Sequence, residues 1–319
     1  MSIFIWACIA IILGFIGLIW SADRFVAGSA AIAKNMGVSK LMIGLTIVAF
    51  GTSAPEILVS IFSALEGFGG LAVGNALGSN LANIGLVLGV TAIIAPIRIQ
   101  GYILKQEYLV MLLVIVISGW FLSDVHLAAW EGYVLIGLLI PLLIWIVMIK
   151  KHHPEDEDEE IPQYSNTVAV LWFLVGLVVL AVSAQALVWA AQTIASHFGV
   201  SPLIIGLTVV AIGTSLPELA ASVISALKGH HDIALGNIIG SNIFNLLIVM
   251  GIAPVINPLT LDSMAFSRDY MAMAGLSVVL GAAMAFVYWI NKGKNAYLGR
   301  WAGVLLLLFY VGYYYVLFQ

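Results

Sequence analysis

Residues 44–60 read GLTIVAFGTSAPEILVS, and residues 206–222 read GLTVVAIGTSLPELAAS. The two stretches lie 162 positions apart, and the same offset aligns GNALGSNLAN at 74–83 with GNIIGSNIFN at 236–245. Self-similarity at one fixed offset is the signature of an internal repeat. The chain is therefore predicted to contain two copies of one unit.

The composition is that of an integral membrane protein. Of the 319 residues, 62% are hydrophobic and only 9% are charged, whereas about a quarter of the residues in soluble domains are charged. Apolar stretches near the roughly 20 residues that a membrane span requires recur along the whole chain. We expect ten membrane-spanning helices, with approximate extents 3–33, 40–65, 71–95, 107–123, 128–149, 167–196, 203–227, 232–256, 270–291 and 298–317.

Five of these spans fall in each copy of the unit. Residues 1–149 are expected to form the first five-helix repeat and residues 167–319 the second, with an acidic linker at 150–166 between them. Because five is an odd number, the second copy enters the membrane from the opposite side. The expected fold is thus all-α, with two inverted repeats, an arrangement typical of secondary transporters that bind substrate near the membrane midplane.

The basic residues predict the orientation in the membrane. If the N-terminus lies outside, ten of the twelve Lys and Arg residues fall in inner loops or at the adjoining span ends. Short loops rich in Lys and Arg stay on the cytoplasmic side. We therefore expect a multi-pass protein of the cell membrane with both termini outside. The linker, which contains KKHHPEDEDEE at 150–160, is expected to be a solvated cytoplasmic hinge.

Two glutamates define the candidate site. Glu56 and Glu218 lie near the middle of the second and seventh predicted spans, where a charged side chain is costly unless it faces a cavity or a partner. No Lys, Arg or His lies at comparable depth in spans 2, 3, 7 or 8. A bound cation is therefore the expected partner, and a protonated, hydrogen-bonded pair is the alternative.

Polar side chains recur around both glutamates at helical spacing, which places each set on one face of its helix. All of them offer oxygen, and none offers sulfur or imidazole. Such a set suits hard cations such as Ca²⁺ and Na⁺ rather than zinc or copper. The first set is Thr52, Ser60, Ser63, Asn75, Ser79 and Asn83, and its twins are Thr214, Ser222, Ser225, Asn237, Ser241 and Asn245.

Prolines beside the glutamates are expected to break both helices. A proline has no N–H to donate, and its ring displaces the carbonyl four residues earlier. Pro55 acts in this way on Gly51, and Pro217 acts on Gly213. The freed carbonyls of broken transporter helices can coordinate ions. We therefore expect unwound segments at 49–53 and 211–215.

Counting charges suggests a mechanism. Two carboxylates neutralise one Ca²⁺ or two Na⁺, and a third Na⁺ would make transport electrogenic. Because the same oxygens would serve both ions, their binding would be mutually exclusive, which antiport requires. Access to the site would alternate between the two sides of the membrane by sliding of spans 1 and 6.

The doubled motifs, GTSAPE at 51–56 with GNALGSNLAN and GTSLPE at 213–218 with GNIIGSNIFN, resemble the two alpha-repeats of the sodium/calcium exchanger branch of the Ca²⁺/cation antiporter superfamily. The resemblance covers nearly the whole chain. It implies that Glu56 and Glu218 bind Ca²⁺ together with the backbone carbonyls of Thr52 and Thr214. It further implies one Na⁺ site made of Ala49, Thr52, Ser53, Ser79 and Glu218, and an inverted mate made of Ala211, Thr214, Ser215, Ser241 and Glu56.

The resemblance also places Asn83 and Asn245 at the border of the middle of the site. Many family members, including the K⁺-dependent exchangers, carry aspartate at one of these two positions. Asn245 therefore argues against K⁺ co-transport. The expected partners are the lipid bilayer and the transported Ca²⁺ and Na⁺, with no resident cofactor and no nucleic acid, and the sequence does not set the oligomeric state.

Three other functions remain as alternatives. A Ca²⁺/H⁺ antiporter is the nearest, because protons compete for buried carboxylates. A cation channel would use the same oxygens but conduct without a counter-ion. An enzyme is the least favoured, because the chain contains neither an HExxH nor a GxSxG motif.

Overall fold

The computed structural model describes residues 2–149, 163–199 and 211–319, and nearly all of them form helices. The first half of the chain contains α1 (Ser2–Met36), α2 (Lys40–Ile43), the π-helical turn η1 (Gly44–Val48), α3 (Ala49–Thr52), α4 (Ala54–Leu65), α5 (Gly69–Ala82), η2 (Asn83–Leu88), α6 (Gly89–Ile94), β1 (Ile97–Arg98), α7 (Gly101–Lys105), α8 (Glu107–Leu122), β2 (His126–Leu127) and α9 (Ala129–Ile149). The second half contains α10 (Asn166–His197), α12 (Ala211–Thr214), α13 (Leu216–Leu227), α14 (His231–Phe244), η5 (Asn245–Val249), α15 (Met250–Ile256), β3 (Leu259–Thr260), η6 (Ala265–Tyr270), α16 (Met271–Ile290), β4 (Tyr297–Leu298) and α17 (Arg300–Leu317).

Membrane-length helices occupy most of the predicted spans. Within the described residues, seven helices are long and apolar enough to cross a bilayer, and the bent pair Lys40–Thr52 and Ala54–Leu65 adds an eighth. Two shorter apolar helices, Ala129–Trp145 and Leu216–Leu227, coincide with the fifth and seventh predicted spans. Residues 203–210 of the seventh span lie outside the described residues. The count of ten spans therefore stays a prediction.

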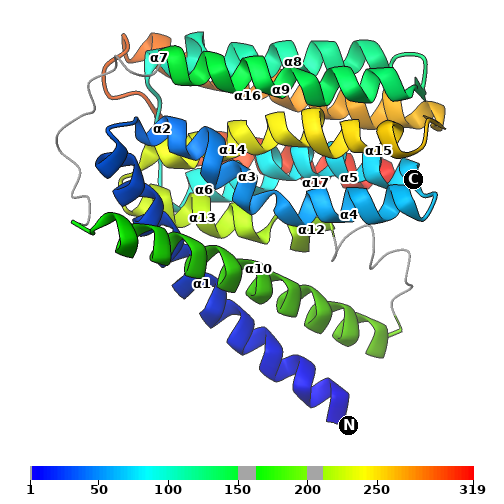
Figure 1. The fold of residues 1–319 in the computed structure, drawn as a ribbon, viewed down its shortest axis with the longest axis horizontal. Helices are drawn as coiled ribbons and strands as arrows, with labels where there is room; N and C mark the ends of the chain where they lie inside the picture. Colours follow the sequence, from blue (N-terminus) through cyan, green and yellow to red (C-terminus); the bar gives the residue numbers. More distant parts are fainter. Residues whose placement is uncertain (1, 150–162, 200–210) are drawn as a thin grey trace.

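The 162-residue offset extends from the sequence to the helices. α4 and α13 have corresponding bounds at this offset, and so do α5 and α14. In Figure 1, α3 and α4 run from left to right, whereas α12 and α13 run from right to left. The order α5 to α6 is likewise opposite to the order α14 to α15. This antiparallel order is the one expected of an inverted repeat.

Each half supplies a helix that covers the other half. α9 packs on α15, and α17 packs on α6. Glycines permit the close approach, because a Cβ at Gly132 would lie 2.5 Å from the carbonyl oxygen of Gly251, and one at Gly303 would lie 2.5 Å from that of Gly89. Two antiparallel strand pairs, β1 with β4 and β2 with β3, join the connecting loops in the same crossed manner.

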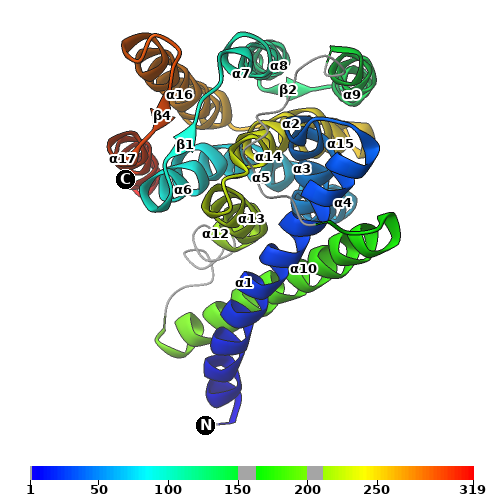
Figure 2. The same ribbon diagram turned by 90° about the vertical axis from the view of Figure 1, so that its left-hand side faces the viewer.

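α1 and α10 form a separate layer. They pack against each other and cross the rest of the bundle obliquely (Figures 1 and 2). The main hydrophobic core lies instead among α5, α14 and the helices around them. Large apolar side chains also cover much of the outer surface, where Trp120 and Trp289 are each 79% exposed. Such a surface suits lipid rather than water.

Candidate ion-binding site

Two single-residue breaks lie at the centre of the bundle. Ser53, with φ −82° and ψ 5°, separates α3 from α4, and the two parts of this span are bent by 45°. Ser215, with φ −86° and ψ 2°, separates α12 from α13 in the same way. Each break is the serine of a GTSxPE motif, so the sequence repeat places one break in each half.

The breaks are shorter than the unwound segments expected at 49–53 and 211–215. Residues Ala49–Thr52 and Ala211–Thr214 are helical, so the expected extent of unwinding is wrong. The physical reason is that the fixed φ of proline suits the first turn of a helix, which lets the chain resume helical structure at once. The carbonyls of Gly51 and Gly213 still have no N–H donor four residues later, because those residues are Pro55 and Pro217.

Glu56 and Glu218 meet between the two halves. Each lies in the first turn of its helix, α4 or α13, where the helix dipole favours negative charge. Each residue is 1% exposed, and the two carboxyl groups are close enough to interact electrostatically. No Lys or Arg side chain pairs with either glutamate among the ion pairs of the described residues. The structure therefore brings both predicted carboxylates into one buried site.

Hydroxyls from each break contact the glutamate of the opposite half. The Ser53 hydroxyl donates to Oε1 of Glu218 at 3.1 Å, and the Thr52 side chain lies beside the same carboxylate. Thr214 occupies the matching place beside Glu56. The residues predicted to share a site from different halves of the sequence are thus neighbours in the structure.

Several buried oxygens at this centre have no partner among the described residues. Oε2 of Glu56 and Oε2 of Glu218 accept no hydrogen bond, and the hydroxyls of Ser215 and Ser241 make none. Nearly all buried polar groups in proteins are hydrogen-bonded, because leaving them unpaired is costly. A cluster of unpaired oxygens around two carboxylates is an arrangement that a bound cation would complete. Ser79, the counterpart of Ser241, is 4% exposed on α5.

Asn75 and Asn237 hold the glutamate backbones in place. The Asn75 amide donates to the backbone carbonyl of Glu56 at 3.2 Å, and the Asn237 amide donates to that of Glu218 at 3.4 Å. Asn237 also donates to Ser222 and accepts from the Thr52 hydroxyl, both at 3.0 Å. These two asparagines therefore tie α4 to α5 and α13 to α14.

Asn83 and Asn245 stand at the start of the π-helical turns η2 and η5. Each is 1% exposed, and both amide atoms of each side chain lack a partner among the described residues. π-helical turns are rare and occur often at functional sites. These turns were not predicted from the sequence.

A second pair of asparagines, Asn80 and Asn242, was not predicted as part of the site. The Asn80 amide donates to the backbone carbonyl of Asn242 at 3.2 Å, and the side-chain oxygens of both residues are buried without a partner. The two residues correspond at the 162-residue offset, and both end a GSN triplet. The repeat is the sequence signal that marks these two asparagines as a pair. They come one position after Ser79 and Ser241, so they fall outside the four-residue spacing that defines one face of each helix.

Two of the four serines farther along α4 and α13 have partners outside the ion site. The Ser60 hydroxyl donates to the backbone carbonyl of Val249, at the end of η5, and Ser222 accepts from Asn237. Both hydroxyls therefore join neighbouring helices. Ser63 is 7% exposed, and the Ser225 hydroxyl has no partner among the described residues.

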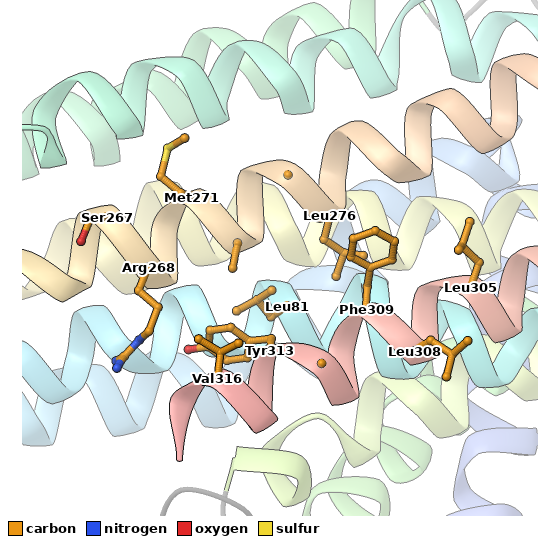
Figure 3. Close-up of a pocket in the computed structure, with 13 residues that line it drawn as sticks. Leu81, Ser267, Arg268, Met271, Leu276, Leu305, Leu308, Phe309, Tyr313 and Val316 are labelled. Atoms are coloured by element: carbon orange, nitrogen blue, oxygen red, sulfur yellow. The ribbon is translucent and has the colours of Figure 1, made fainter. Parts of the chain in front are cut away.

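A crevice lies beside the second helix break, between α10, α4 and the start of α13. Its volume is about 150 Å³. It is lined by Gln185 and Gln192 on α10, by Val59 on α4 and by Thr214 at the second break. A larger groove of about 730 Å³ lies between α16 and α17, and Figure 3 shows it lined mainly by apolar side chains, with Arg268 and Ser267 at one end. Neither glutamate lines either cavity, but Pro55, Thr214 and Pro217 of the two motifs line the crevice.

Comparison with known proteins identifies the family. The model of the family described as sodium/calcium exchanger protein matches residues 6–148 and 168–319. This chain belongs to the sodium/calcium exchanger family. The resemblance predicted from the doubled motifs is confirmed, and the family is one of membrane transporters rather than enzymes.

Relatives of the exchanger cover almost its full length. A protein of Alkalimonas amylolytica with the provisional name antiporter CaxA is 46% identical, over 98% of this chain and 99% of its own. Sodium/calcium exchanger MaX1 of Methanosarcina acetivorans is 30% identical over 97% of both chains. The Ca²⁺/H⁺ antiporter ChaA of Bacillus subtilis is 25% identical over 84% of this chain and 80% of its own.

A solved structure shares the fold of this exchanger. The sodium–calcium exchanger NCX_Mj, soaked with zero Na⁺ and Ca²⁺, superimposes with a TM-score of 0.83 at 32% sequence identity. The match covers 98% of this chain and 99% of the other. The architecture is therefore that of a membrane exchanger.

Proposed function

We propose that this protein exchanges Ca²⁺ for Na⁺ across the cell membrane, with the ions bound between the two halves at Glu56 and Glu218. The observation that carries the proposal is the meeting of these two buried carboxylates, each with an unpaired oxygen and neither with a cationic side chain among the described residues. Two carboxylates balance one Ca²⁺ or two Na⁺. Carboxylate, hydroxyl and carbonyl oxygens are the ligands that hard cations prefer.

We assign Ca²⁺ to the centre of this site. Its ligands would be the carboxylates of Glu56 and Glu218 and the backbone carbonyls of Thr52 and Thr214. Thr52 and Thr214 each come directly before a helix break, and each side chain lies beside a glutamate, which supports this assignment. An all-oxygen shell from both halves would then hold one divalent ion.

Two Na⁺ sites would flank the Ca²⁺ site and share its glutamates. The contact from the Ser53 hydroxyl to Glu218, at 3.1 Å, supports the first of them. The unpaired hydroxyls of Ser215 and Ser241 support the second. The proposed ligands are Ala49, Thr52, Ser53, Ser79 and Glu218 for one site, and Ala211, Thr214, Ser215, Ser241 and Glu56 for the other.

Exchange would follow from competition for the shared oxygens. Ca²⁺ and Na⁺ could not occupy the glutamates together, so each ion would leave before the other binds. Movement of the α1 and α10 layer across the bundle would expose the site first to one side and then to the other. The separate position of this layer and its close internal packing support such a movement. A third Na⁺ would make each cycle electrogenic.

We also propose an orientation of the protein in the membrane. The N-terminal end of α1 and the C-terminal end of α17 lie toward the right of Figure 1, whereas α2, α7 and the C-terminal end of α13 lie toward the left. The left-hand elements carry Lys40, Lys105 and Lys228. Positive residues mark the cytoplasmic side, so we place both termini outside. The linker at 150–166 would be cytoplasmic, although residues 150–162 of it lie outside the described part of the chain.

Proton-coupled exchange is the second candidate. Protons can replace Na⁺ on buried carboxylates, and the similarity to ChaA, whose name is Ca²⁺/H⁺ antiporter, favours testing it. The same glutamates would carry Ca²⁺ in either mechanism. The two candidates differ only in the ion that drives Ca²⁺ movement.

Uptake of radiolabelled Ca²⁺ into proteoliposomes separates the candidates. The purified protein is reconstituted, and outward gradients of Na⁺, K⁺ and H⁺ are imposed one at a time. We expect the Na⁺ gradient to drive uptake and the K⁺ gradient to have no effect. Uptake driven only by the H⁺ gradient would replace the Na⁺ proposal by the proton-coupled one. Uptake that needs no counter-ion gradient and is far faster than exchange would indicate a channel instead.

A further inference from the structure

α1 and α10 contact the broken helices differently, although they correspond in the repeat. α1 packs against α13, where Ala22 and Phe25 share a buried cluster with Ala221. The corresponding contact of α10 with α4 is slight in the described part of the chain. The crevice beside Thr214 separates α10 from α4 instead, with Gln185 on one wall and Val59 on the other. The protein is therefore closed where α1 packs on α13, and it is open where the crevice separates α10 from α4.

An ion pair joins the two helices on the closed side. Lys228, at the C-terminal end of α13, lies 2.7 Å from Oδ1 of Asp23 on α1 and also donates to the Asp23 backbone carbonyl at 3.2 Å. The neighbouring Arg24 has a different partner, because its guanidinium lies 4.8 Å from the centre of the Trp172 ring on α10. Asp23 and Lys228 thus connect α1 directly to the helix that carries Glu218.

The repeat has no equivalent ion pair. At the 162-residue offset Asp23 corresponds to Gln185, and Lys228 corresponds to Glu66. The register is secure, because the Ser-Ala dipeptide before Asp23 recurs before Gln185, and Glu66 and Lys228 both follow the last residue of the matching helices α4 and α13. An amide and a carboxylate cannot form an ion pair.

We propose that the Asp23–Lys228 ion pair is a one-sided latch that favours the conformation with the crevice open along α10. The proposal rests on the alternating-access function given above. In an inverted repeat, the opposite conformation exchanges the environments of the two halves: α10 closes on α4, and α1 parts from α13. The ion pair then breaks, and Gln185 and Glu66 meet without replacing it. The latch therefore biases the equilibrium between the two conformations.

The expected size of this bias is modest. Both side chains are partly exposed, Lys228 at 31% and Asp23 at 43%, and partly exposed ion pairs shift equilibria by on the order of two- to five-fold. A reporter of the minor conformation reveals such a change best, because its signal rises in proportion to the small population. Ala221, which is fully buried against α1, is the natural position for that reporter.

Cysteine labelling in the reconstituted full-length protein tests the latch. Cys8 is first replaced by serine, and Ala221→Cys then reports separation of α1 from α13 through its reaction with a membrane-impermeant thiol reagent, without Na⁺ or Ca²⁺. Val59→Cys, the repeat-related residue on the crevice wall, is the matched reporter of the open side. We expect Asp23→Asn to raise Ala221→Cys labelling about two- to five-fold without raising that of Val59→Cys.

Two further variants decide the outcome. The charge exchange Asp23→Lys with Lys228→Asp should return labelling at position 221 to the starting rate, which a merely local packing defect would not allow. Installing a pair on the other side, with Gln185→Asp and Glu66→Lys, should raise labelling at position 221 while the native pair is intact. Unchanged labelling in Asp23→Asn, or failure of the charge exchange to restore it, would overturn the latch. Because labelling needs no transported ion, loss of the Na⁺/Ca²⁺ proposal in the transport assay would be a separate result.

Discussion

The hydroxyl of Ser53 donates to Oε1 of Glu218 across a distance of 3.1 Å, although 165 residues separate them in the sequence. The serine forms the helix break of one half, and the glutamate begins the broken helix of the other. Neither half could build this contact alone. The site is therefore a product of the antiparallel pairing of two similar units.

Ser53→Ala should weaken Na⁺ binding more than Ca²⁺ binding. The substitution removes a hydroxyl that contacts Glu218 and that we assign to one Na⁺ site, whereas Ca²⁺ retains both carboxylates. A lost hydrogen bond or ligand of this kind costs about 1–2 kcal/mol, so the Na⁺ concentration for half-maximal exchange should rise about ten-fold. Ser267→Ala, on the distant groove between α16 and α17, is the control. An equal loss for both ions would argue against this assignment.

Asn237→Ala should destabilise the protein more than Asn75→Ala. Asn237 hydrogen-bonds with Thr52, Ser222 and the backbone of Glu218, whereas the side chain of Asn75 has one such contact, with the backbone of Glu56. At about 1 kcal/mol for each net hydrogen bond, we expect losses of about 2–3 and about 1 kcal/mol. Thermal unfolding in detergent measures both, and equal midpoints would contradict the asymmetry seen here.

Gly240→Ala should disturb the packing of α14 on the first broken span. The added Cβ would lie 2.5 Å from the carbonyl oxygen of Leu45 and 2.6 Å from the Cβ of Ala49. Overpacking against backbone costs about 1–3 kcal/mol, and Ala49 belongs to the proposed Na⁺ site, so both stability and exchange should fall. Gly312→Ala has no described atom within 4 Å of the new Cβ and serves as the control in the same melting and transport assays.

Ca²⁺ should protect the protein against unfolding through the two glutamates. A ligand at 100 times its Kd stabilises the native state by about 2.7 kcal/mol. The parent protein should therefore melt at higher temperature in saturating Ca²⁺, whereas Glu218→Gln should show little shift. The measurement is a melting curve in detergent with and without Ca²⁺. A full shift in Glu218→Gln would remove that carboxylate from the Ca²⁺ site.

The sequence was sufficient to find the glutamates and the family. Two acidic residues in apolar spans, flanked by the same motif at one fixed offset, need no structure to be recognised. The resemblance to the exchanger family implied that Ser53 and Glu218, or Thr214 and Glu56, share a site. The ligand assignments themselves stay predictions, because the contacts among these residues do not show which ion each one binds.

Other features depend on three-dimensional packing and were not predictable. Ser60 and Ser222 have the same helical spacing as candidate ligands, but their hydroxyls are used between helices. The confinement of each break to Ser53 or Ser215 depends on how readily proline starts a helix. The π-helical turns that begin at Asn83 and Asn245 are set by the fit of neighbouring helices, which hydrophobic periodicity does not encode.

Glu56 and Glu218 together are proposed to bind the transported Ca²⁺. Radiolabelled Ca²⁺ uptake into Na⁺-loaded proteoliposomes tests this proposal with Glu56→Gln, Glu218→Gln and the matched control Glu66→Gln, whose carboxylate is exposed at the end of α4. We expect each buried substitution to abolish uptake, because one remaining carboxylate cannot neutralise a divalent ion, and we expect the control to retain uptake. Full uptake by either Glu56→Gln or Glu218→Gln would show that the two carboxylates do not bind Ca²⁺ together.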